Sequence, residues 1–160
     1  NRYPERDTSL QARYARAIAR YFLGGRSAVQ DAVAEVEKLI RDKPDYPYFW
    51  ELKADILMRA GKAADAIPSL RQTLKLEPDA PLVQVQLATA LQQVGGSGNI
   101  SESVRLLRQA VVNDTNPTAH RMLASAYYKQ GQQPKADAET AQAYFLEGNI
   151  KQAQDRKSVV

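Results

Sequence analysis

The sequence predicts an all-α fold, a solenoid of antiparallel helix pairs with about nine helices. The first observation is a repeat of helix-ending glycines, because Gly61, Gly95 and Gly131 stand 34 and 36 residues apart. The second is a repeat of helix-opening prolines at the same spacing, Pro47, Pro81 and Pro117. A single helix pair of this length cannot bury its own apolar face, so such pairs stack on their neighbours.

Small side chains repeat in the same phase within the helices. One set lies in the first helix of each pair and another in the second: Ala54, Ala88 and Ala124, then Ala66, Ser103 and Ala136. Small residues let two helices approach closely, and a bulky residue three positions after each member of the first set fills the space beside them. A period near 34 with this packing pattern predicts a tetratricopeptide-like (TPR-like) right-handed α-solenoid. The usual TPR tryptophan is present only at Trp50.

The expected helices follow from local start and stop signals. Asp7, Thr8 or Ser9 can cap the first helix, and Gly24 with the next glycine ends it. Proline after Lys43 stops the second helix. The stretch 95–99 is longer than the usual turn, so we expect it to be exposed and mobile. The expected helices cover about 8–23, 27–42, 47–60, 63–76, 81–94, 101–113, 117–130 and 134–147.

A ninth helix is predicted over 149–158, because Gly148 and Ala153 stand five apart like the glycine and small-residue pairs of the earlier turns. We therefore predict one domain over 1–160, with helix pairs at about 8–43, 47–78, 81–114 and 117–147 and a terminal helix. The length of 160 residues agrees with a single domain.

Composition excludes several classes of protein. Apolar residues make up 44% of the chain and charged residues 25%, which is typical of a folded domain. No apolar run reaches the roughly 18 residues of a transmembrane helix. The chain has no cysteine, so it forms no disulfide and no thiolate metal site. The first residue is Asn1 and no signal segment follows, so we expect a processed protein or a piece of a longer one.

The formal charge of +4 is concentrated at the start of the chain, where residues 1–26 carry six arginines and two acidic residues. Arg13, Arg16 and Arg20 share one helix face. One interpretation is a solvated surface, which is usual opposite an apolar stripe. The other is a docking stripe for an acidic neighbouring domain. Nucleic acid is not expected as a partner, because the basic excess is small and no aromatic platform interleaves it.

A closer resemblance rests on four runs of sequence. These are Tyr3-Pro4-Glu5 through Thr8-Ser9-Leu10, Ala12-Arg13-Tyr14-Ala15-Arg16-Ala17, Pro47-Tyr48-Phe49-Trp50-Glu51-Leu52-Lys53-Ala54 and Ala143-Tyr144-Phe145-Leu146-Glu147-Gly148. Together they resemble the C-terminal TPR arm of bacterial periplasmic zinc metallopeptidases related to the CAAX prenyl proteases, the BepA group. The resemblance implies a periplasmic arm that recruits or positions protein substrates during envelope quality control. A cytoplasmic location is left open.

The chain itself lacks the residues of a catalytic or metal site. The peptidase motif of that family, H-E-x-x-H, needs two histidines one helical turn apart, whereas this chain has one. That residue, His120, stands at a helix-packing position, which favours a structural role. The glycine-rich run 95–98 follows a helix and lacks the lysine of a phosphate-binding loop. We expect no cofactor and no bound metal.

A partner-binding groove is predicted from the outward positions of the first helix in each pair. These positions are Tyr48, Glu51, Asp55, Met58, Arg59, Val85, Thr89, Gln92, Gln93, Arg121, Ser125, Tyr128 and Lys129. The groove runs from an acidic end to a basic, aromatic end. It lacks the Lys and Asn pattern of TPR clamps that hold C-terminal carboxylates, so an adaptor for chaperone tails is disfavoured.

Three functional interpretations follow. The first is a non-catalytic interaction scaffold, the C-terminal TPR arm of a zinc metallopeptidase, which binds a protein or peptide or its own peptidase domain. The second is a free-standing TPR adaptor in pilus, secretion or envelope assembly. A coding sequence for H-E-x-x-H ahead of Asn1 would separate these two. The third is an enzyme in its own right, which no group of residues supports.

Overall fold

The computed structural model describes residues 8–24, 28–112 and 116–157, and the side chains up to residue 148. These residues form eight α-helices and no strand. The chain divides into two compact units, Asn1–Asp79 and Ala80–Val160, which are described separately. The predicted all-helical architecture is confirmed, whereas the grouping of the whole chain into one domain stays a prediction.

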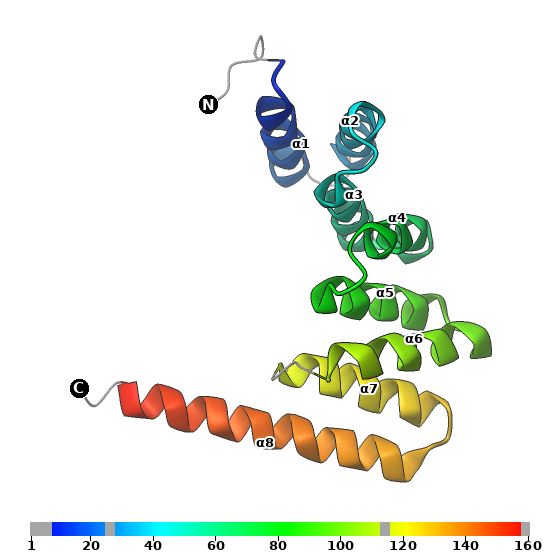
Figure 1. Cartoon of the computed structure of the whole chain (residues 1–160), viewed down its shortest axis with the longest axis vertical. Helices are drawn as coiled ribbons and strands as arrows, with labels where there is room; N and C mark the ends of the chain where they lie inside the picture. Colours follow the sequence, from blue (N-terminus) through cyan, green and yellow to red (C-terminus); the bar gives the residue numbers. More distant parts are fainter. Residues whose placement is uncertain (1–7, 25–27, 113–115, 158–160) are drawn as a thin grey trace. The chain divides into compact units, whose positions relative to one another are not determined.

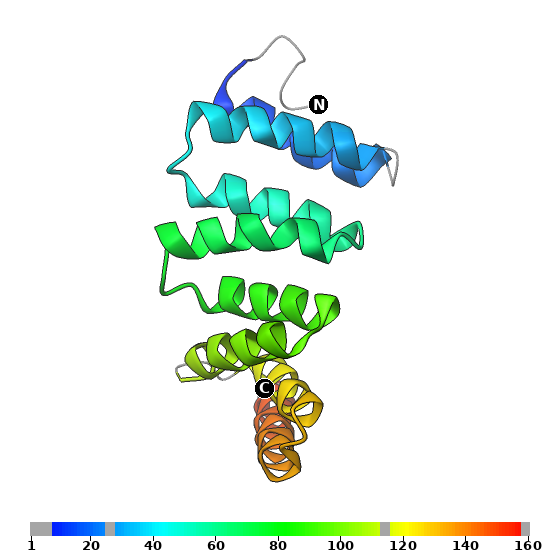
Figure 2. The ribbon, with the colours of Figure 1, turned by 90° about the vertical axis from the view of Figure 1, so that its right-hand side faces the viewer.

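The first unit holds two helix pairs. α1 (Leu10–Gly24) packs on α2 (Val29–Asp42), and α3 (Pro47–Arg59) packs on α4 (Ala63–Leu76), with α2 also packed on α3. Figure 1 and Figure 2 show these helices side by side as antiparallel pairs. The Ser9 hydroxyl accepts a hydrogen bond from the Ala12 backbone N–H, so Ser9 caps α1 as one of the three predicted candidates.

The core of the first unit joins the two pairs. Its buried members come from α1, α2 and α3 and include Ala17, Val36, Leu39, Phe49 and Ile56. Polar contacts also stabilise the packing between the two helix pairs. The Trp50 indole N–H donates to the Pro44 carbonyl at 2.8 Å, and Lys53 pairs with Glu37 at 2.7 Å. The tryptophan expected from the repeat pattern therefore forms a hydrogen bond between α3 and the loop before it.

The second unit repeats the arrangement with α5 (Pro81–Val94), α6 (Ser97–Ala110), α7 (Pro117–Lys129) and α8 (Gln133–Lys157). Successive helices pack on each other, and α5 also touches α7. The small positions predicted from the repeat are buried in both units, as expected for close helix approaches: Ala54, Ala66, Ala88, Ser103, Ala124 and Ala136.

Glycine closes three of the turns within the pairs. Gly61 and Gly131 have φ of 75° and 72°, a left-handed conformation that residues with a Cβ rarely adopt. In both turns the residue after the glycine donates a backbone hydrogen bond to a carbonyl five positions earlier. This is the Schellman ending of a helix. The repeating glycines therefore end α3 and α7 as predicted.

The turn between α5 and α6 corrects the sequence analysis. We expected an exposed, mobile stretch over 95–99 and a helix beginning at Ser101. Residues 96–98 are exposed, but the predicted helix start is wrong. Instead Gly95 and Gly96 make the whole turn with positive φ, and α6 begins at Ser97. The Asn99 side chain donates to the Gly95 carbonyl at 2.7 Å, which ties the first turn of α6 to the glycine turn. The expected end of this helix at residue 113 lies outside the described residues.

The predicted ninth helix is also corrected. α8 continues without a break from Gln133 to Lys157 through Gly148, and it extends well past the end of α7 (Figure 1). Gly148 is absent from the described glycines with positive φ, so it does not turn the chain. A single glycine costs a helix only about 1 kcal/mol relative to alanine. Without a following proline, that cost does not end the helix.

Candidate functional site

The predicted groove residues lie on helices of both units. We define the α3 surface as Tyr48, Glu51, Asp55, Met58 and Arg59 in the first unit. We define the α5–α7 surface as Val85, Thr89, Gln92, Gln93, Arg121, Ser125, Tyr128 and Lys129 in the second. Each surface is described within its own unit, and one groove that runs along both stays a prediction.

On the α3 surface, one carboxylate is paired and one is not. Arg59 donates from Nε to both carboxylate oxygens of Asp55 at 3.0 Å, and its guanidinium lies 5.9 Å from the centre of the Phe22 ring. Glu51 lies one helical turn before Asp55 and is partly buried. Within the described part of the chain, the Glu51 side chain makes no hydrogen bond or ion pair.

The electrostatic surroundings of Glu51 disfavour its charged form. Burial raises the pKa of Glu51, and the neighbouring charges of Glu77 and Asp55 raise it further. Each of these influences makes the ionised carboxylate less stable than it would be in water. A positive group placed beside Glu51 would reverse the effect.

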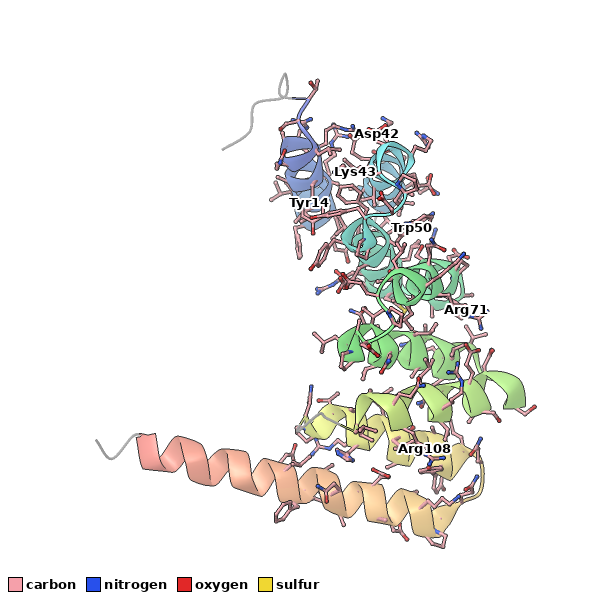
Figure 3. The ribbon with its side chains drawn as sticks, viewed as in Figure 1. Tyr14, Asp42, Lys43, Trp50, Arg71 and Arg108 are labelled. Carbon is pink, nitrogen blue, oxygen red and sulfur yellow. The ribbon has the colours of Figure 1, made fainter. Side chains whose placement is uncertain are left out.

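An aromatic pocket adjoins the α3 surface, and the sequence analysis did not identify it. We call it the tyrosine pocket; its volume is about 370 Å³, and it is lined by Leu10, Gln11, Tyr14, Lys43, Tyr46, Tyr48 and Phe49. The Tyr46 ring lies 4.7 Å from the Phe49 ring and 5.4 Å from the Tyr48 ring, centre to centre. Figure 3 shows Tyr14 and Lys43 in this part of the first unit.

The local sequence explains how the rings are gathered. Pro47 begins α3, which leaves Tyr46 in an extended conformation just before the helix and Tyr48 in its first turn. Tyr14 reaches the same place from α1, with its ring 6.0 Å from that of Phe49. The run of aromatic residues around Pro47 was the available signal. It could not show that Tyr14, more than thirty positions earlier, completes the pocket.

Tyr14 also couples the pocket to the α3 surface. Burial raises the pKa of the Tyr14 hydroxyl, and the charges of Glu51, Tyr46 and Asp55 raise it further, in that order. The phenol therefore stays neutral at physiological pH and lies within the electrostatic reach of the Glu51 carboxylate. Glu51 therefore lies near the tyrosine pocket, whose lining includes Tyr14.

The α5–α7 surface differs because some of its side chains already bond to other groups of the second unit. The Gln92 amide donates to the Met122 carbonyl at 3.1 Å, and Lys129 Nζ lies 3.4 Å from the Gln92 carbonyl. Only 7% of Gln92 is exposed, which corrects the expectation that it faces outward. The reason is that α7 packs beside α5, and a long amide side chain reaches across to a helix carbonyl.

The basic, aromatic end of the predicted groove faces α8. Arg121, Ser125 and Tyr128 share a shallow hollow of about 340 Å³ with residues of α8 that include Asp137 and Tyr144. The guanidinium of Arg121 lies 2.5 Å from the carboxylate of Glu147 and 5.9 Å from the centre of the Tyr144 ring. Tyr128 is 67% exposed. The structure brings these three predicted residues together, and their part in binding stays a prediction.

The arginine stripe of α1 turns partly toward α2. Arg13 pairs with Asp42 and lies 3.6 Å from Glu35. Burial raises the pKa of Glu35, but Lys38, Arg13 and Arg20 together outweigh burial and lower it. At least Arg13 therefore stabilises the first helix pair. Docking of an acidic domain on Arg13, Arg16 and Arg20 stays a prediction.

His120 lies in the packing between α7 and α8. It is 8% exposed, and its Nδ1 lies 2.7 Å from a carboxylate oxygen of Glu139. No group of three potential metal ligands is found in the described residues. No helix in the described part of the chain is both long and apolar enough to cross a membrane.

Comparison with known proteins identifies the repeats. The family model described as tetratricopeptide repeat matches residues 16–81 and 52–93. The chain contains TPR repeats. The matched region includes α3 and α5, which carry the α3 surface and the first half of the α5–α7 surface. The TPR fold is that of a scaffold for protein binding and points to a domain without enzymatic activity.

Solved structures share the TPR-like fold. MamA of strain MSR-1 has a TM-score of 0.76 at 21% identity and covers 92% of this chain and 82% of its own. A MamA structure from Desulfovibrio magneticus RS-1 has a TM-score of 0.77 at 18% identity and covers 88% of this chain and 77% of its own. These likenesses confirm the predicted TPR-like α-solenoid class and concern the fold alone.

Two curated relatives are much longer than this chain. The Vi polysaccharide export protein VexE of Salmonella typhi is 33% identical over 121 residues, which is 74% of this chain and 18% of that protein. The beta-barrel assembly-enhancing protease of Yersinia pestis is 27% identical over 145 residues, 90% of this chain and 29% of that protein. The chain therefore spans less than a third of the length of either relative.

Proposed function

We propose that this chain is the TPR arm of a periplasmic zinc metallopeptidase, where it recruits or positions protein substrates or envelope assembly partners. The observation that carries the proposal is the likeness to the beta-barrel assembly-enhancing protease, which extends over 90% of the chain. The four sequence runs that resemble the BepA group add support, because they include the start of α1 and the middle of α8, outside the region that the general repeat model matches.

The residues of the chain suit a binding role within a larger enzyme. Its single histidine is buried against Glu139, so peptide hydrolysis would take place in the peptidase domain of the parent protein. The α3 and α5–α7 surfaces expose aromatic and charged side chains, among them Tyr48 and Tyr128. Aromatic residues and arginine are the types that dominate binding energy at protein interfaces.

The proposal is tested with the longest reading frame that contains this chain. We expect it to encode H-E-x-x-H ahead of Asn1, and the full protein to bind zinc and cleave casein. The chain alone should do neither, and the immobilised chain should capture the separately expressed peptidase domain or an unfolded envelope protein. A full reading frame without the motif would overturn the assignment as a peptidase arm.

A free-standing TPR adaptor in pilus, secretion or envelope assembly is the second candidate. The likeness to a polysaccharide export protein at 33% identity is the observation that favours it. The same reading frame separates the two candidates. An adaptor would lack the zinc motif, and its partner would be a component of an assembly or export machine. A periplasmic location belongs to both candidates, because both relatives are named for processes of the cell envelope.

A further inference from the structure

The tyrosine pocket leaves two of its rings open to an incoming group. Tyr46 is 42% exposed and Tyr48 is 50% exposed, although both rings contact other aromatic rings. The volume of about 370 Å³ is near the lower end of the range for ligand pockets, about 300–1,000 Å³. The pocket is therefore suited to a single large side chain, with ring edges and faces available on several sides.

Glu51 places a carboxylate beside this pocket. It follows Tyr48 by three positions on α3, so the two side chains lie on the same helix face about 4.5 Å apart along the axis. Glu77 and Asp55 add negative charge near Glu51, and only Asp55 has a described cation, Arg59, as its partner. This side of the pocket therefore favours a positive group.

Lys43, which lines the pocket itself, is a positive group. Lys43 Nζ lies 5.9 Å from the centre of the Tyr46 ring, so a cation already occupies that part of the pocket. A second cation placed there would be repelled. The basic side chain of a partner is therefore expected beside Glu51 and not beside Lys43.

We propose that the first unit binds an extended partner segment that carries an aromatic side chain and, two positions away, a lysine or arginine. The aromatic side chain enters the tyrosine pocket, and the basic side chain pairs with Glu51. In an extended segment, side chains two positions apart point the same way and are separated by about 6.6–7 Å. This spacing allows one side chain in the pocket and the next over Glu51. The inference rests on the proposed function as a protein-binding scaffold.

The occupant follows from charge complementarity. An acidic segment would meet Glu51, Asp55 and Glu77, which repel it. A purely apolar segment would cover Glu51 and leave the carboxylate without a partner, which is costly in a partly buried site. An aromatic and basic segment satisfies both halves of the region.

The probe is a capped peptide, Ser-Gly-Phe-Ser-Arg-Ser-Gly, added to the full ¹⁵N-labelled chain and followed by amide chemical shifts. We expect shifts that centre on α1, the residues around Tyr46 and the first turns of α3. A peptide with glutamate in place of arginine should bind at least tenfold more weakly. A peptide with serine in place of phenylalanine should lose the shifts around Tyr46.

Matched variants make the test specific. Glu51→Gln should weaken binding of the arginine peptide at least about fivefold. It should also reduce the difference in affinity between the arginine and glutamate peptides. Asp31→Asn removes the same charge from an exposed position on α2 and should leave both affinities unchanged. Tyr48→Ser should weaken both the arginine and the glutamate peptide, with an unchanged circular dichroism spectrum showing that the variant is folded.

Several outcomes would overturn the inference: equal affinities for the arginine and glutamate peptides, a Glu51→Gln effect no larger than that of Asp31→Asn, shifts that centre elsewhere, or no binding of any peptide. Failure of the proposed function is a separate result. If Tyr48→Ser with Glu51→Gln captures the peptidase domain or an envelope protein with the same affinity as wild type, this inference fails and the scaffold function stands. If the wild-type chain captures neither, the scaffold function fails.

Discussion

The two units of this protein share the same helix-pair framework but differ in the contacts that their outward-facing side chains make. In the first unit, exposed tyrosines surround a pocket and Glu51 has no partner among the described residues. In the second, Gln92 bonds to the backbone of α7, and Arg121 pairs with Glu147. The repeat pattern therefore specifies packing, whereas the outward positions are free to stabilise the unit or to remain open for a partner.

This comparison bears on how each surface would bind. A side chain held by its neighbours loses less conformational freedom on binding, but an incoming partner must compete with those neighbours. An unpaired, partly buried carboxylate gains more from a new cation, because nothing else compensates its charge. We therefore expect charge to matter more at Glu51 and shape to matter more along α7.

The largest expected effect tests the part that the two units share. Ala54→Leu in the first unit and Ala88→Leu in the second should each destabilise the fold by roughly 1–3 kcal/mol, because both positions are fully buried where helices approach closely. Urea denaturation followed by circular dichroism measures the change. Ser97→Ala at the exposed start of α6 is the control, expected within about 0.5 kcal/mol of wild type. Equal midpoints for all three variants would show that the repeat register is wrong.

The next prediction concerns the unit in which binding energy resides. Arg121→Ala combined with Tyr128→Ala should weaken capture of the peptidase domain or an envelope protein by at least about tenfold, near 1.4 kcal/mol. Charge reversal of Arg20, the exposed member of the arginine stripe, should act mainly at low salt, because salt screens exposed charges. Pull-downs at physiological salt and at low salt measure both. If only the charge-reversed variant loses capture at physiological salt, docking takes place on α1 and not on the α5–α7 surface.

A smaller effect tests the corrected end of the second unit. Gly148→Ala should stabilise α8 by up to about 1 kcal/mol and raise helicity, since no atom lies within 4 Å of the added Cβ. Gly131→Ala is the matched control in the same unit and should destabilise, because its φ of 72° strains any residue with a Cβ. Circular dichroism and thermal melting compare the two. If Gly148→Ala destabilises the protein, a break between two helices at Gly148 is the better interpretation.

The smallest effect is the pH dependence of Glu51. Its pKa is raised on folding, so the ionised form weakens the fold. Below the ordinary glutamate pKa of about 4.3, Glu51 is protonated in both the folded and the unfolded state and does not change the free energy of unfolding. As the pH rises from there through the higher pKa of the folded state, the ionised carboxylate lowers the free energy of unfolding. Glu51→Gln should match wild type near pH 4 and exceed it at pH 7 by less than about 1 kcal/mol. Urea midpoints at the two pH values measure this, and a wild type that is more stable than the variant at pH 7 would contradict it.

Sequence reasoning succeeded where a local signal decides the structure. α4 and α5 begin and end at the predicted residues, because a proline or a glycine turn sets their ends. It failed where neighbours in space decide. α6 begins directly after two glycines with positive φ, which shortens the turn, and the burial of Gln92 depends on α7. The tyrosine pocket was missed because Tyr14 and Tyr46 come together only when α1 packs near α3.

The sequence by itself determined the class of the protein: the all-helical fold, the glycine turns after α3 and α7, the buried small positions and the lack of a zinc-binding motif. These features depend on backbone conformation and on side-chain volume at positions that repeat along the chain. Only the tertiary structure decided which outward side chains are engaged and which are open. Arg121 forms an ion pair with Glu147, whereas the Glu51 side chain has no partner in the described part of the chain. Both results depend on distances between helices, which the repeat period does not encode.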